Sequence, residues 1–283
     1  MKKVGIVSCD KWINKIDEDK NLKEALINLG IDTEIISWQK PIKDKDLLVI
    51  RSVWGYQDYY DEFKKWLNDT NIPICNSKEI ILDNIRKDKQ FAILDNNGVE
   101  HIETKFLSID EIPEKVEGIC VVKPSISGSG DNTFIVNSDI KNSIKEGKIK
   151  PIYRKILSNN PDCRLMIQPY VNEINDGEYS CIFINGILTH TMKRFPSIFH
   201  DKKKPFLIEE VPKEIIDLAK KVERIEEYKD YLYMRVDMVL VNNKAKIMEV
   251  ELAEPDLLTK NIDNPKIKSK VINTFAKEIE SRI

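Results

Sequence analysis

The first part of the chain alternates short apolar runs with amphipathic helical segments. Four apolar runs are typical of buried strands and lie at residues 4–9, 33–38, 47–52 and 72–77. Between them, Leu22, Leu26 and Leu29 share one face of an expected helix, and a second helix is expected at 57–68. Short strands that alternate with helices predict a parallel sheet covered on both faces. We therefore expect residues 1–78 to form an α/β domain.

From about residue 79 the pattern changes to strands that follow one another directly. Strand-like segments are expected at 118–124, 132–137, 164–171, 179–186, 187–195 and 232–252. Helices are expected at 77–83, 86–96, 150–158, 212–229 and 265–282. The turns FINGIL and VLVNNKAKI join pairs of strands, and Asn/Gly turns of this kind are typical of antiparallel hairpins. Residues 79–283 are therefore expected to form an α+β domain around a largely antiparallel sheet.

The composition argues against several classes of protein. The 283 residues include 45 Lys and Arg against 47 Asp and Glu, and a net charge of −2 argues against a nucleic-acid binder with a broad basic face. No apolar run approaches the roughly 18 residues of a membrane-spanning helix. The five cysteines are scattered and form no CxxC pair, which favours a reducing compartment. We expect a cytoplasmic protein without nucleic-acid or membrane partners.

Acidic residues stand within apolar strands near the end of the chain. Alternation places Arg235 and Asp237 on one strand face, and Glu249 and Glu251 on one face of the next strand. If the connecting loop holds residues 242–244, Asp237 lies opposite Glu249 and Arg235 opposite Glu251; a two-residue loop would separate these faces. Converging carboxylates need a counter-charge, and Mg²⁺ is a natural one. The alternative is an outward polar face in which Arg235 pairs with Glu251.

A loop of small residues follows the strand-like run GICVVKP. Lys123 ends this run, and Ser127, Gly128, Ser129 and Gly130 come next. Such a loop lets backbone N–H groups approach phosphate oxygens, and a nearby ammonium adds positive charge. The loop matches neither the P-loop nor the Rossmann motif. A flexible hairpin loop beside an exposed lysine is the alternative.

Three further positions are candidates for binding. Residues 168–171 end a strand at a proline, where free backbone groups could form hydrogen bonds with the edge of an adenine ring. Glu178 begins the next strand. A turn followed by a strand, without any ligand, explains these residues equally well. Arg51 ends a parallel-type strand, where ligands of open α/β sheets bind, although its aromatic loop could simply pack on the next helix. Lys89 lies on a helical stretch and would otherwise be an ordinary surface lysine.

Together these segments resemble the ATP-grasp superfamily, in particular the glutathione-synthetase-like branch that includes the cyclo-ligase of D-cycloserine biosynthesis. The matching segments are RSVWGY (51–56), EF and W (62, 63 and 66), DKQFAIL with a later glycine (88–98), VVKP with SGSG (121–130), QPYVNEINDGEYS (168–180), THTMK (189–193), RVD (235–237) and EVELAEP (249–255). Gly55 and Thr189 depart from the Asp and Ser usual in the branch. The resemblance implies an ATP-grasp fold, with an N-terminal parallel-sheet domain and antiparallel nucleotide-binding subdomains, the smaller of which spans about 100–170 and carries a lid.

The resemblance also implies a role for each matching residue. Lys89 and Lys123 would contact ATP, and Ser127, Gly128, Ser129 and Gly130 would close over its phosphates. The adenine would be held by Gln168, Pro169, Tyr170 and Val171, and the ribose would be contacted by Glu178. Two Mg²⁺ ions, for which Mn²⁺ could substitute, would bind to Asp237, Glu249 and Glu251. Arg235 would face the transferred phosphate, and Arg51 and Lys193 would shape the acceptor pocket.

The function implied is a carboxylate–amine ligase that works through an acyl-phosphate and releases ADP and phosphate. Its partners would be a small carboxylate and a small amine, and homodimers are the commonest assembly of the superfamily. Two alternatives keep the fold: an intramolecular cyclo-ligase and a small-molecule kinase. An alternative of another class is a regulatory protein that binds the nucleotide without catalysis. The sequence does not identify the substrates.

Overall fold

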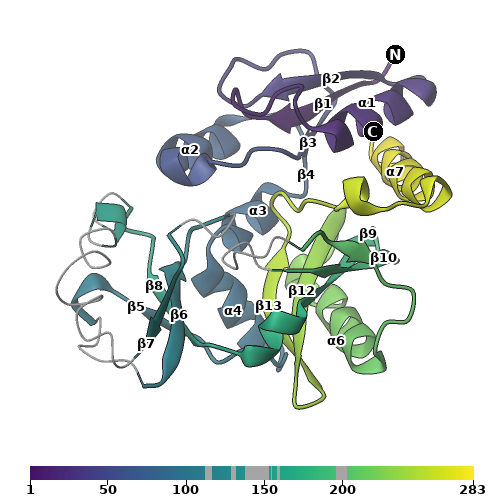
Figure 1. Ribbon diagram of the computed structural model, residues 1–283. Helices are drawn as coiled ribbons and strands as arrows, with labels where there is room; N and C mark the ends of the chain where they lie inside the picture. The colour runs from purple at the N-terminus through teal and green to yellow at the C-terminus, as the bar shows by residue number, and fades with distance from the viewer. Residues whose placement is uncertain (112–116, 129–131, 138–152, 154, 158–159, 196–202) are drawn as a thin grey trace.

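Three β-sheets form the frame of the protein (Figure 1). The computed structural model describes residues 1–111, 117–128, 132–137, 153, 155–157, 160–195 and 203–283. Sheet A is parallel, whereas sheets B and C are antiparallel. The mixture of a parallel and two antiparallel sheets confirms the fold class that the sequence predicts.

Sheet A is built by the N-terminal part of the chain, and its strand order is β2-β1-β3-β4. Its strands are β1 (Lys3–Ser8), β2 (Asp32–Ser37), β3 (Leu47–Ile50) and β4 (Ile74–Cys75). Its helices are α1 (Asp17–Asn28), the 3-10 helix η1 (Tyr56–Tyr59) and α2 (Tyr60–Asp69). Leu22 and Leu26 of α1 pack on one face of the sheet, and Phe63 and Leu67 of α2 belong to the core on the other. Burial on both faces explains why β1 and β3 are continuous apolar runs.

The last helix of the chain returns to the first domain. Helix α7 (Pro265–Glu280) begins at Asn264, whose Oδ1 accepts a hydrogen bond from the Lys266 N–H at 3.0 Å. It lies beside α1, near both ends of the chain (Figure 1). Its Val271 and Phe275 join a core that contains residues of both sheet A and sheet B. The two sheets are therefore joined by a shared hydrophobic core.

Sheet B has the strand order β11-β10-β9-β12-β13. Its strands are β9 (Glu178–Ile184), β10 (Ile187–Arg194), β11 (Phe206–Leu207), β12 (Tyr233–Val241) and β13 (Lys244–Glu251). The helices that pack on it include α3 (Lys78–Asn84), α4 (Lys87–Asn96) and α6 (Lys213–Glu223). The helix expected at 212–229 is shorter, because α6 ends at Glu223 and the 3-10 helix η5 (Glu226–Tyr228) follows.

Sheet C is smaller and has the strand order β5-β8-β6-β7. Its strands are β5 (Lys105–Leu107), β6 (Ile119–Pro124), β7 (Phe134–Asn137) and β8 (Leu165–Pro169). Short 3-10 helices stand at η2 (Ile109–Glu111), η4 (Asn172–Asp176) and η6 (Thr259–Asn261). The Tyr153 hydroxyl donates to the carbonyl oxygen of Val122 at 2.8 Å, in a small core under the sheet. The helix expected at 150–158 lies largely outside the described residues.

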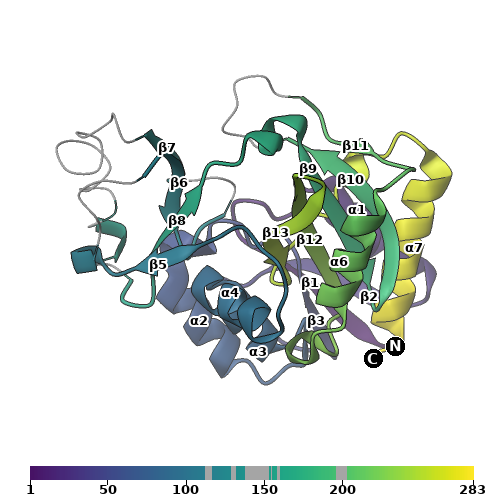
Figure 2. The ribbon, with the colours of Figure 1, turned by 90° about the horizontal axis from the view of Figure 1, so that it is seen from below.

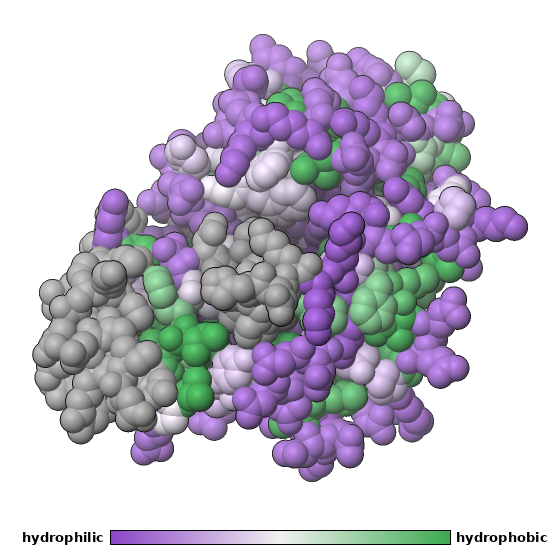
Figure 3. Space-filling view, viewed as in Figure 1, coloured by the Kyte–Doolittle hydropathy of each residue, from purple (hydrophilic) through white to green (hydrophobic). Residues whose placement is uncertain are grey.

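The edge of sheet B that is formed by β13 faces sheet C (Figure 1). Helices α3 and α4 lie between these two sheets in Figure 1, and Figure 2 shows the same parts from below. The face seen in Figure 3 is mostly hydrophilic, and its hydrophobic side chains occur in small separate groups. Within the described ranges, no helix is both long and apolar enough to cross a membrane.

Candidate active site

Charged side chains from distant parts of the chain gather around β12 and β13. The carboxylates are Glu178, Asp237, Glu249, Glu251 and Glu254. The cationic side chains are Lys87, Lys123, Arg194 and Arg235. We call these residues the charged cluster. Its carboxylates outnumber its cations, so the cluster favours binding of an additional cation.

Asp237 is the most enclosed acid of the charged cluster, with 1% of its surface exposed. Its Oδ1 accepts hydrogen bonds from Ser180 Oγ at 2.6 Å and from Arg235 Nε at 3.0 Å. Its Oδ2 accepts from Arg194 Nη2 at 2.6 Å and from Arg235 Nη2 at 3.0 Å. Burial alone would raise the pKa of Asp237, but the two guanidinium groups outweigh burial and lower this pKa. Asp237 is therefore an ionised carboxylate held by two cations.

The hairpin of β12 and β13 brings basic and acidic side chains onto one face. Arg235 lies opposite Glu251, and Asp237 lies opposite Glu249, which confirms the pairing that alternation predicts. Arg235 Nη2 also forms an ion pair with Glu251 Oε1, the contact expected for an outward polar face. Arg235 is, however, only 2% exposed, so the face is buried rather than solvated.

The turn of this hairpin differs from the expectation. The strands close on a two-residue turn at 242–243, not on a three-residue loop. Both turn residues have positive φ, which is the type I′ geometry that fits the twist of a hairpin. Such a turn alone would move the acids of β13 to the opposite face. The register shifts again beside Asp237, where Met248 is the extra residue of a β-bulge, and this shift restores the pairing.

Strand β13 lies at the edge of sheet B, and two side-chain amides satisfy its outer backbone groups. Gln90 Nε2 donates to the Val250 carbonyl at 2.6 Å, and its Oε1 accepts from the Val250 N–H at 3.0 Å. Asn84 Oδ1 accepts from the Leu252 N–H at 2.8 Å. These amides replace the hydrogen bonds of a missing neighbouring strand, and they fix the backbone on which the acids of β13 stand.

Lys87, rather than Lys89, joins the charged cluster. Lys87 Nζ lies 2.9 Å from Glu249 Oε1 and donates to the Ser127 carbonyl at 2.7 Å. Burial would lower the pKa of Lys87, but Glu249 outweighs burial and raises this pKa. Lys89 is exposed and pairs with Asp83, so the structure does not bring this predicted ATP contact to the cluster. The two lysines differ because residues two positions apart on a helix point in different directions.

Three acids of the charged cluster hold protons more tightly than usual: Glu178, Glu251 and Glu254. Burial raises the pKa of Glu251 to about 7, because Arg235 offsets burial only in part. Burial and the charge of Glu251 raise the pKa of Glu254 to about 8. Crowded carboxylates with raised pKa values are typical of sites that bind a cation or transfer protons.

Lys123 adds a second ammonium group to the charged cluster. It stands near the end of β6, and burial lowers the pKa of Lys123 more than the charge of Glu249 raises it. A lysine with little compensation is placed to bind an anion. The following loop begins with Ser127 and Gly128; a Cβ added at Gly128 would lie 2.4 Å from Gln57 Nε2. Ser129 and Gly130 lie outside the described residues.

The segment expected to bind adenine consists of the last two residues of β8 in sheet C and the two residues that follow this strand. It consists of Gln168, Pro169, Tyr170 and Val171. The Tyr170 N–H donates to the Ile119 carbonyl at 2.8 Å, so this backbone donor is already used within sheet C. The Val171 carbonyl accepts from the Ile174 N–H at 3.1 Å. Any adenine contact is therefore restricted to the remaining groups of the segment.

Glu178 and Lys193 lie on neighbouring strands of sheet B. Glu178 is 9% exposed, and its Oε2 accepts from Arg194 Nη2 at 2.9 Å. Burial raises the pKa of Glu178, against the effect of Arg194. Lys193 Nζ lies 3.5 Å from the centre of the Tyr179 ring, in a cation–π contact, and burial lowers the pKa of Lys193. Glu178 thus joins the charged cluster, and Lys193 stands beside it.

Arg51, which was expected to shape the acceptor pocket, lies in a buried network of ion pairs and hydrogen bonds. Its Nη1 donates to the Pro255 carbonyl at 2.9 Å, its Nη2 pairs with Glu18, and its Nε lies 3.4 Å from Asp19 Oδ1. Its guanidinium carbon lies 5.0 Å from the centre of the Tyr233 ring. With 3% of its surface exposed, Arg51 joins parts of the protein instead of lining an open acceptor pocket. The sequence did not reveal this role, because the partners come from distant segments.

Three residues of the charged cluster were not among the predicted site residues: Lys87, Arg194 and Glu254. Glu254 belongs to the matching segment EVELAEP, and Arg194 directly follows THTMK, so the resemblance contained a signal for both. Lys87 gave no signal that distinguished it from Lys89, because both stand in the same charged stretch.

The carboxylate oxygens of the cluster are ligands of the kind that a hard cation such as Mg²⁺ prefers. In the structure these oxygens are paired with lysine and arginine side chains. The contacts of Lys87 with Glu249 and of Arg235 with Glu251 each involve Oε1. Among the described residues, no three His, Cys, Asp or Glu side chains are arranged so that they could hold a metal ion. Mg²⁺ commonly uses one or two carboxylates together with phosphate oxygens. Glu249 and Glu251, which share one face of β13, fit this pattern.

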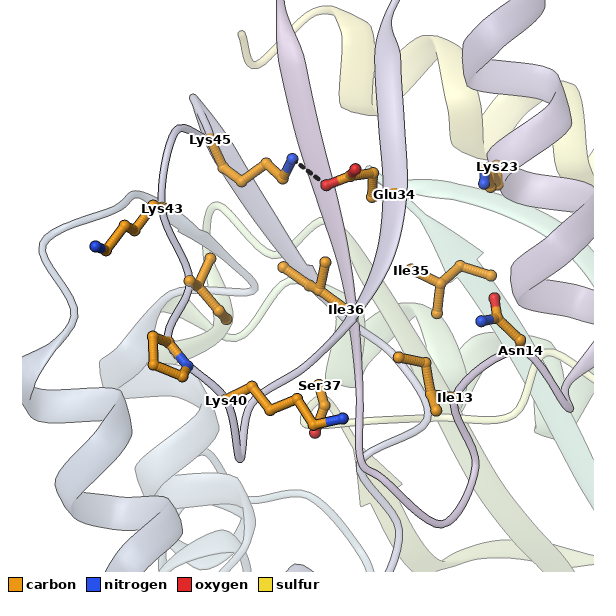
Figure 4. Close-up of a pocket in the computed structure, with 12 residues that line it drawn as sticks. Ile13, Asn14, Lys23, Glu34, Ile35, Ile36, Ser37, Lys40, Lys43 and Lys45 are labelled. Carbon is orange, nitrogen blue, oxygen red and sulfur yellow. Dashed lines mark hydrogen bonds and ion pairs between the residues drawn. The ribbon is translucent and has the colours of Figure 1, made fainter.

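A separate cavity of about 460 Å³ opens along β2, in sheet A (Figure 4). Lysines surround an apolar floor that includes Ile35 and Ile36, and Lys45 pairs with Glu34. The cavity shares no residue with the charged cluster, and Glu34 is the one acidic residue among those that line it. We therefore place the candidate active site at the charged cluster.

Solved structures match nearly the whole chain, and a family model matches its N-terminal part. A sequence profile described as the N-terminal domain of D-cycloserine synthetase DcsG matches residues 4–76. The crystal structure of D-cycloserine synthetase DcsG superimposes with a TM-score of 0.83 at 18% identity, covering 99% of each chain. An ATP-grasp RimK domain protein from Sphaerobacter thermophilus gives a TM-score of 0.68 at 12% identity, covering 98% of each chain.

A third structure is the D-alanine–D-alanine ligase from Bacillus anthracis complexed with ATP. Its TM-score is 0.68 at 17% identity, and the match covers 100% of this chain and 98% of that chain. No curated protein matches the sequence. The likeness to these structures shows that the chain has the ATP-grasp fold, which confirms the fold that the sequence predicts.

Proposed function

We propose that this ATP-grasp chain is an ATP- and Mg²⁺-dependent ligase that joins a carboxylate to an amine through an acyl-phosphate. ADP and phosphate are the other products. The observation that carries the proposal is the charged cluster, in which crowded carboxylates lie beside two lysines and two arginines. Phosphoryl transfer to a carboxylate depends mainly on positioning and on charge neutralisation, which such a set of groups supplies.

Lys87 and Lys123 bind the phosphates of ATP in this proposal. Both ammonium groups are close enough to Glu249 for their charges to lower the pKa of this carboxylate, against the effect of burial. The partial burial of Lys123 without a full counter-charge favours binding of an anion. A structural neighbour was crystallised with ATP, which supports the choice of nucleotide. Residues 168–171 remain the proposed adenine contact.

Glu249 and Glu251 hold Mg²⁺ together with phosphate oxygens, and Asp237 is a further candidate ligand. When bound, the metal neutralises negative charge on the phosphates. Arg235 is fixed by Asp237 and Glu251, so it presents an immobile positive charge to the transferred phosphoryl group. Water must be excluded from the site because it would hydrolyse the acyl-phosphate, and the resemblance assigns this role to the small-residue loop that begins at Ser127.

Intramolecular ring closure is a second candidate for the reaction. It is favoured by the match of residues 4–76 to the D-cycloserine synthetase profile and by the TM-score of 0.83. A cyclo-ligase consumes one organic substrate for each ATP, whereas an intermolecular ligase consumes two. Product analysis by mass spectrometry distinguishes them, and it also detects a phosphorylated product, which would indicate a kinase.

A thermal-shift titration with Mg²⁺–ATP tests the proposal. A ligand that binds only the folded protein stabilises it by about 2.7 kcal/mol at 100 times its Kd. We expect a clear upward shift in the wild type that is reduced in Lys123→Met, and ADP release that is lost in Glu249→Gln. No shift in the wild type would contradict the nucleotide site. Binding without ADP release for any carboxylate tried would favour a regulatory protein that only binds the nucleotide.

A further inference from the structure

Two arginines share Asp237, but they are held differently. Arg235 is 2% exposed, and it contacts Asp237, Glu251 and the Asp256 carbonyl, the last at 3.1 Å. Arg194 is the last residue of β10, and 28% of its side chain is exposed. Arg235 is therefore fixed inside the protein, whereas Arg194 stands where the strand ends.

Arg194 is not fully satisfied by its partners. Its Nη2 lies 2.6 Å from Asp237 Oδ2 and 2.9 Å from Glu178 Oε2, so one nitrogen serves two carboxylates. Its Nε is buried and finds no hydrogen-bond partner among the residues that the structure describes. A buried donor without a partner is energetically unfavourable. Arg194 thus has the capacity to bind one further acceptor.

The Arg194 ion pair occupies an oxygen that a metal would need. Asp237 Oδ2 accepts one hydrogen bond from Arg194 and two from Arg235. Both oxygens of Asp237 already accept hydrogen bonds, so a cation that binds Oδ2 must displace one of its donors. Arg194 is the partner that can leave, because it ends a strand and retains Glu178 as a second carboxylate.

We propose that Arg194 exchanges partners in the reaction cycle: it neutralises Asp237 before the metal–nucleotide binds, then yields this carboxylate to the cation and contacts a phosphate oxygen of the nucleotide. This inference rests on the proposed function. A phosphate oxygen suits Arg194 in charge, and Lys123, a proposed phosphate contact, lies close enough to Arg194 for their charges to interact. Metal and Arg194 then compete for one oxygen, so the loss of either strengthens binding of the other.

Direct measurement of Mn²⁺ binding tests the exchange, with Mn²⁺ as the probe in calorimetry or electron paramagnetic resonance. In the presence of ATP, Arg194→Met should bind Mn²⁺ about fivefold or more tightly than the wild type, the lower range of measured coupling between sites. The same variant should lose turnover, because the phosphate contact is gone. A merely structural residue would move both quantities in the same direction. Arg86→Met, which removes an arginine paired with Asp88, is the matched control and should leave Mn²⁺ affinity unchanged.

Two further variants keep the exchange testable if Arg194→Met folds poorly. Arg194→Lys keeps the charge and should give an intermediate Mn²⁺ affinity. In an Asp237→Asn background, Arg194→Met should have no effect on Mn²⁺ binding, because the contested carboxylate is absent. Equal or weaker Mn²⁺ binding by folded Arg194→Met and Arg194→Lys would overturn the exchange and leave the proposed function standing. No Mn²⁺ binding with ATP in the wild type would overturn both.

Discussion

Arg51 and Arg235 donate hydrogen bonds to the carbonyl groups of adjacent residues: Arg51 Nη1 to Pro255 at 2.9 Å, and Arg235 Nη1 to Asp256 at 3.1 Å. Arg51 follows β3 of sheet A, whereas Arg235 lies on β12 of sheet B. The loop after β13 is thus held by an arginine from each sheet. This loop contains Glu254, so residues of sheet A and of sheet B together help to position an acid of the charged cluster.

Replacing Arg51 should destabilise the protein strongly. In Arg51→Met, Glu18 and Asp19 keep buried carboxylates without their cation, and breaking a buried pair in this way costs about 3–5 kcal/mol. Denaturant unfolding followed by circular dichroism measures the loss. Arg224→Met, at an exposed arginine, is the control and should stay within about 0.5 kcal/mol of the wild type. Similar stabilities of the two variants would show that the Arg51 network contributes nothing.

Lys87 and Lys89 offer a matched pair of variants. Lys87→Met should abolish the Mg²⁺–ATP thermal shift and lower ADP release by about 100-fold or more, since it removes a buried cation next to Glu249. Lys89→Met should retain both, because Lys89 is exposed and pairs only with Asp83. ADP release and the thermal shift are measured on both variants. The reverse result would restore Lys89 as the nucleotide contact and remove Lys87 from the proposed mechanism.

The raised pKa of Glu254, about 8, predicts that stability depends on pH. Between its ordinary value of 4.5 and about 8, the folded protein holds a proton that the unfolded chain releases, so stability falls as pH rises through this window and levels off above it. Glu254→Gln removes this slope. The melting temperature of the variant, measured without metal, should therefore rise relative to the wild type from pH 5 to pH 9. Glu210→Gln, at an exposed position, is the control; a pH-independent difference for Glu254→Gln would refute the assignment.

Asp162 joins α2 to the segment before β8 and should stabilise their contact modestly. Its carboxylate lies 2.8 Å from Lys64 Nζ and 3.2 Å from Arg86 Nη1, and the hydrogen bond of Lys64 lowers the pKa of Asp162. Because the side chain is 34% exposed, we expect a loss of only about 1 kcal/mol in Asp162→Asn. A lowered pKa stabilises the fold above the ordinary value of 3.8, so the deficit should shrink as pH falls below about 4.

Melting temperatures at pH 7 and pH 3.5 check this prediction. Asp61→Asn, at an exposed position on the same helix, is the control. A deficit that is equal at both pH values would mean that the effect of Asp162→Asn is not electrostatic.

The hydrophobic pattern predicted most of the secondary structure. Alternating apolar runs and helices gave sheet A, and Asn/Gly turns gave the hairpins of sheet B, because both signals are local in the sequence. The strands β5 and β11 were not expected, since they contain three and two residues and carry too little periodic pattern. The pairing of Asp237 with Glu249 was predicted correctly, but a two-residue turn and a bulge at Met248 produce it, rather than the expected loop.

The sequence by itself determined the classes of the two halves, the acidic hairpin and a set of residues that resembles one superfamily. Only the tertiary structure decided that Lys87 faces Glu249, that Arg51 is enclosed by Glu18 and Pro255, and that Arg194 shares Asp237. The physical reason is that periodicity reports which face of an element is buried, whereas the partner of a charged side chain depends on the packing of elements far apart in the chain.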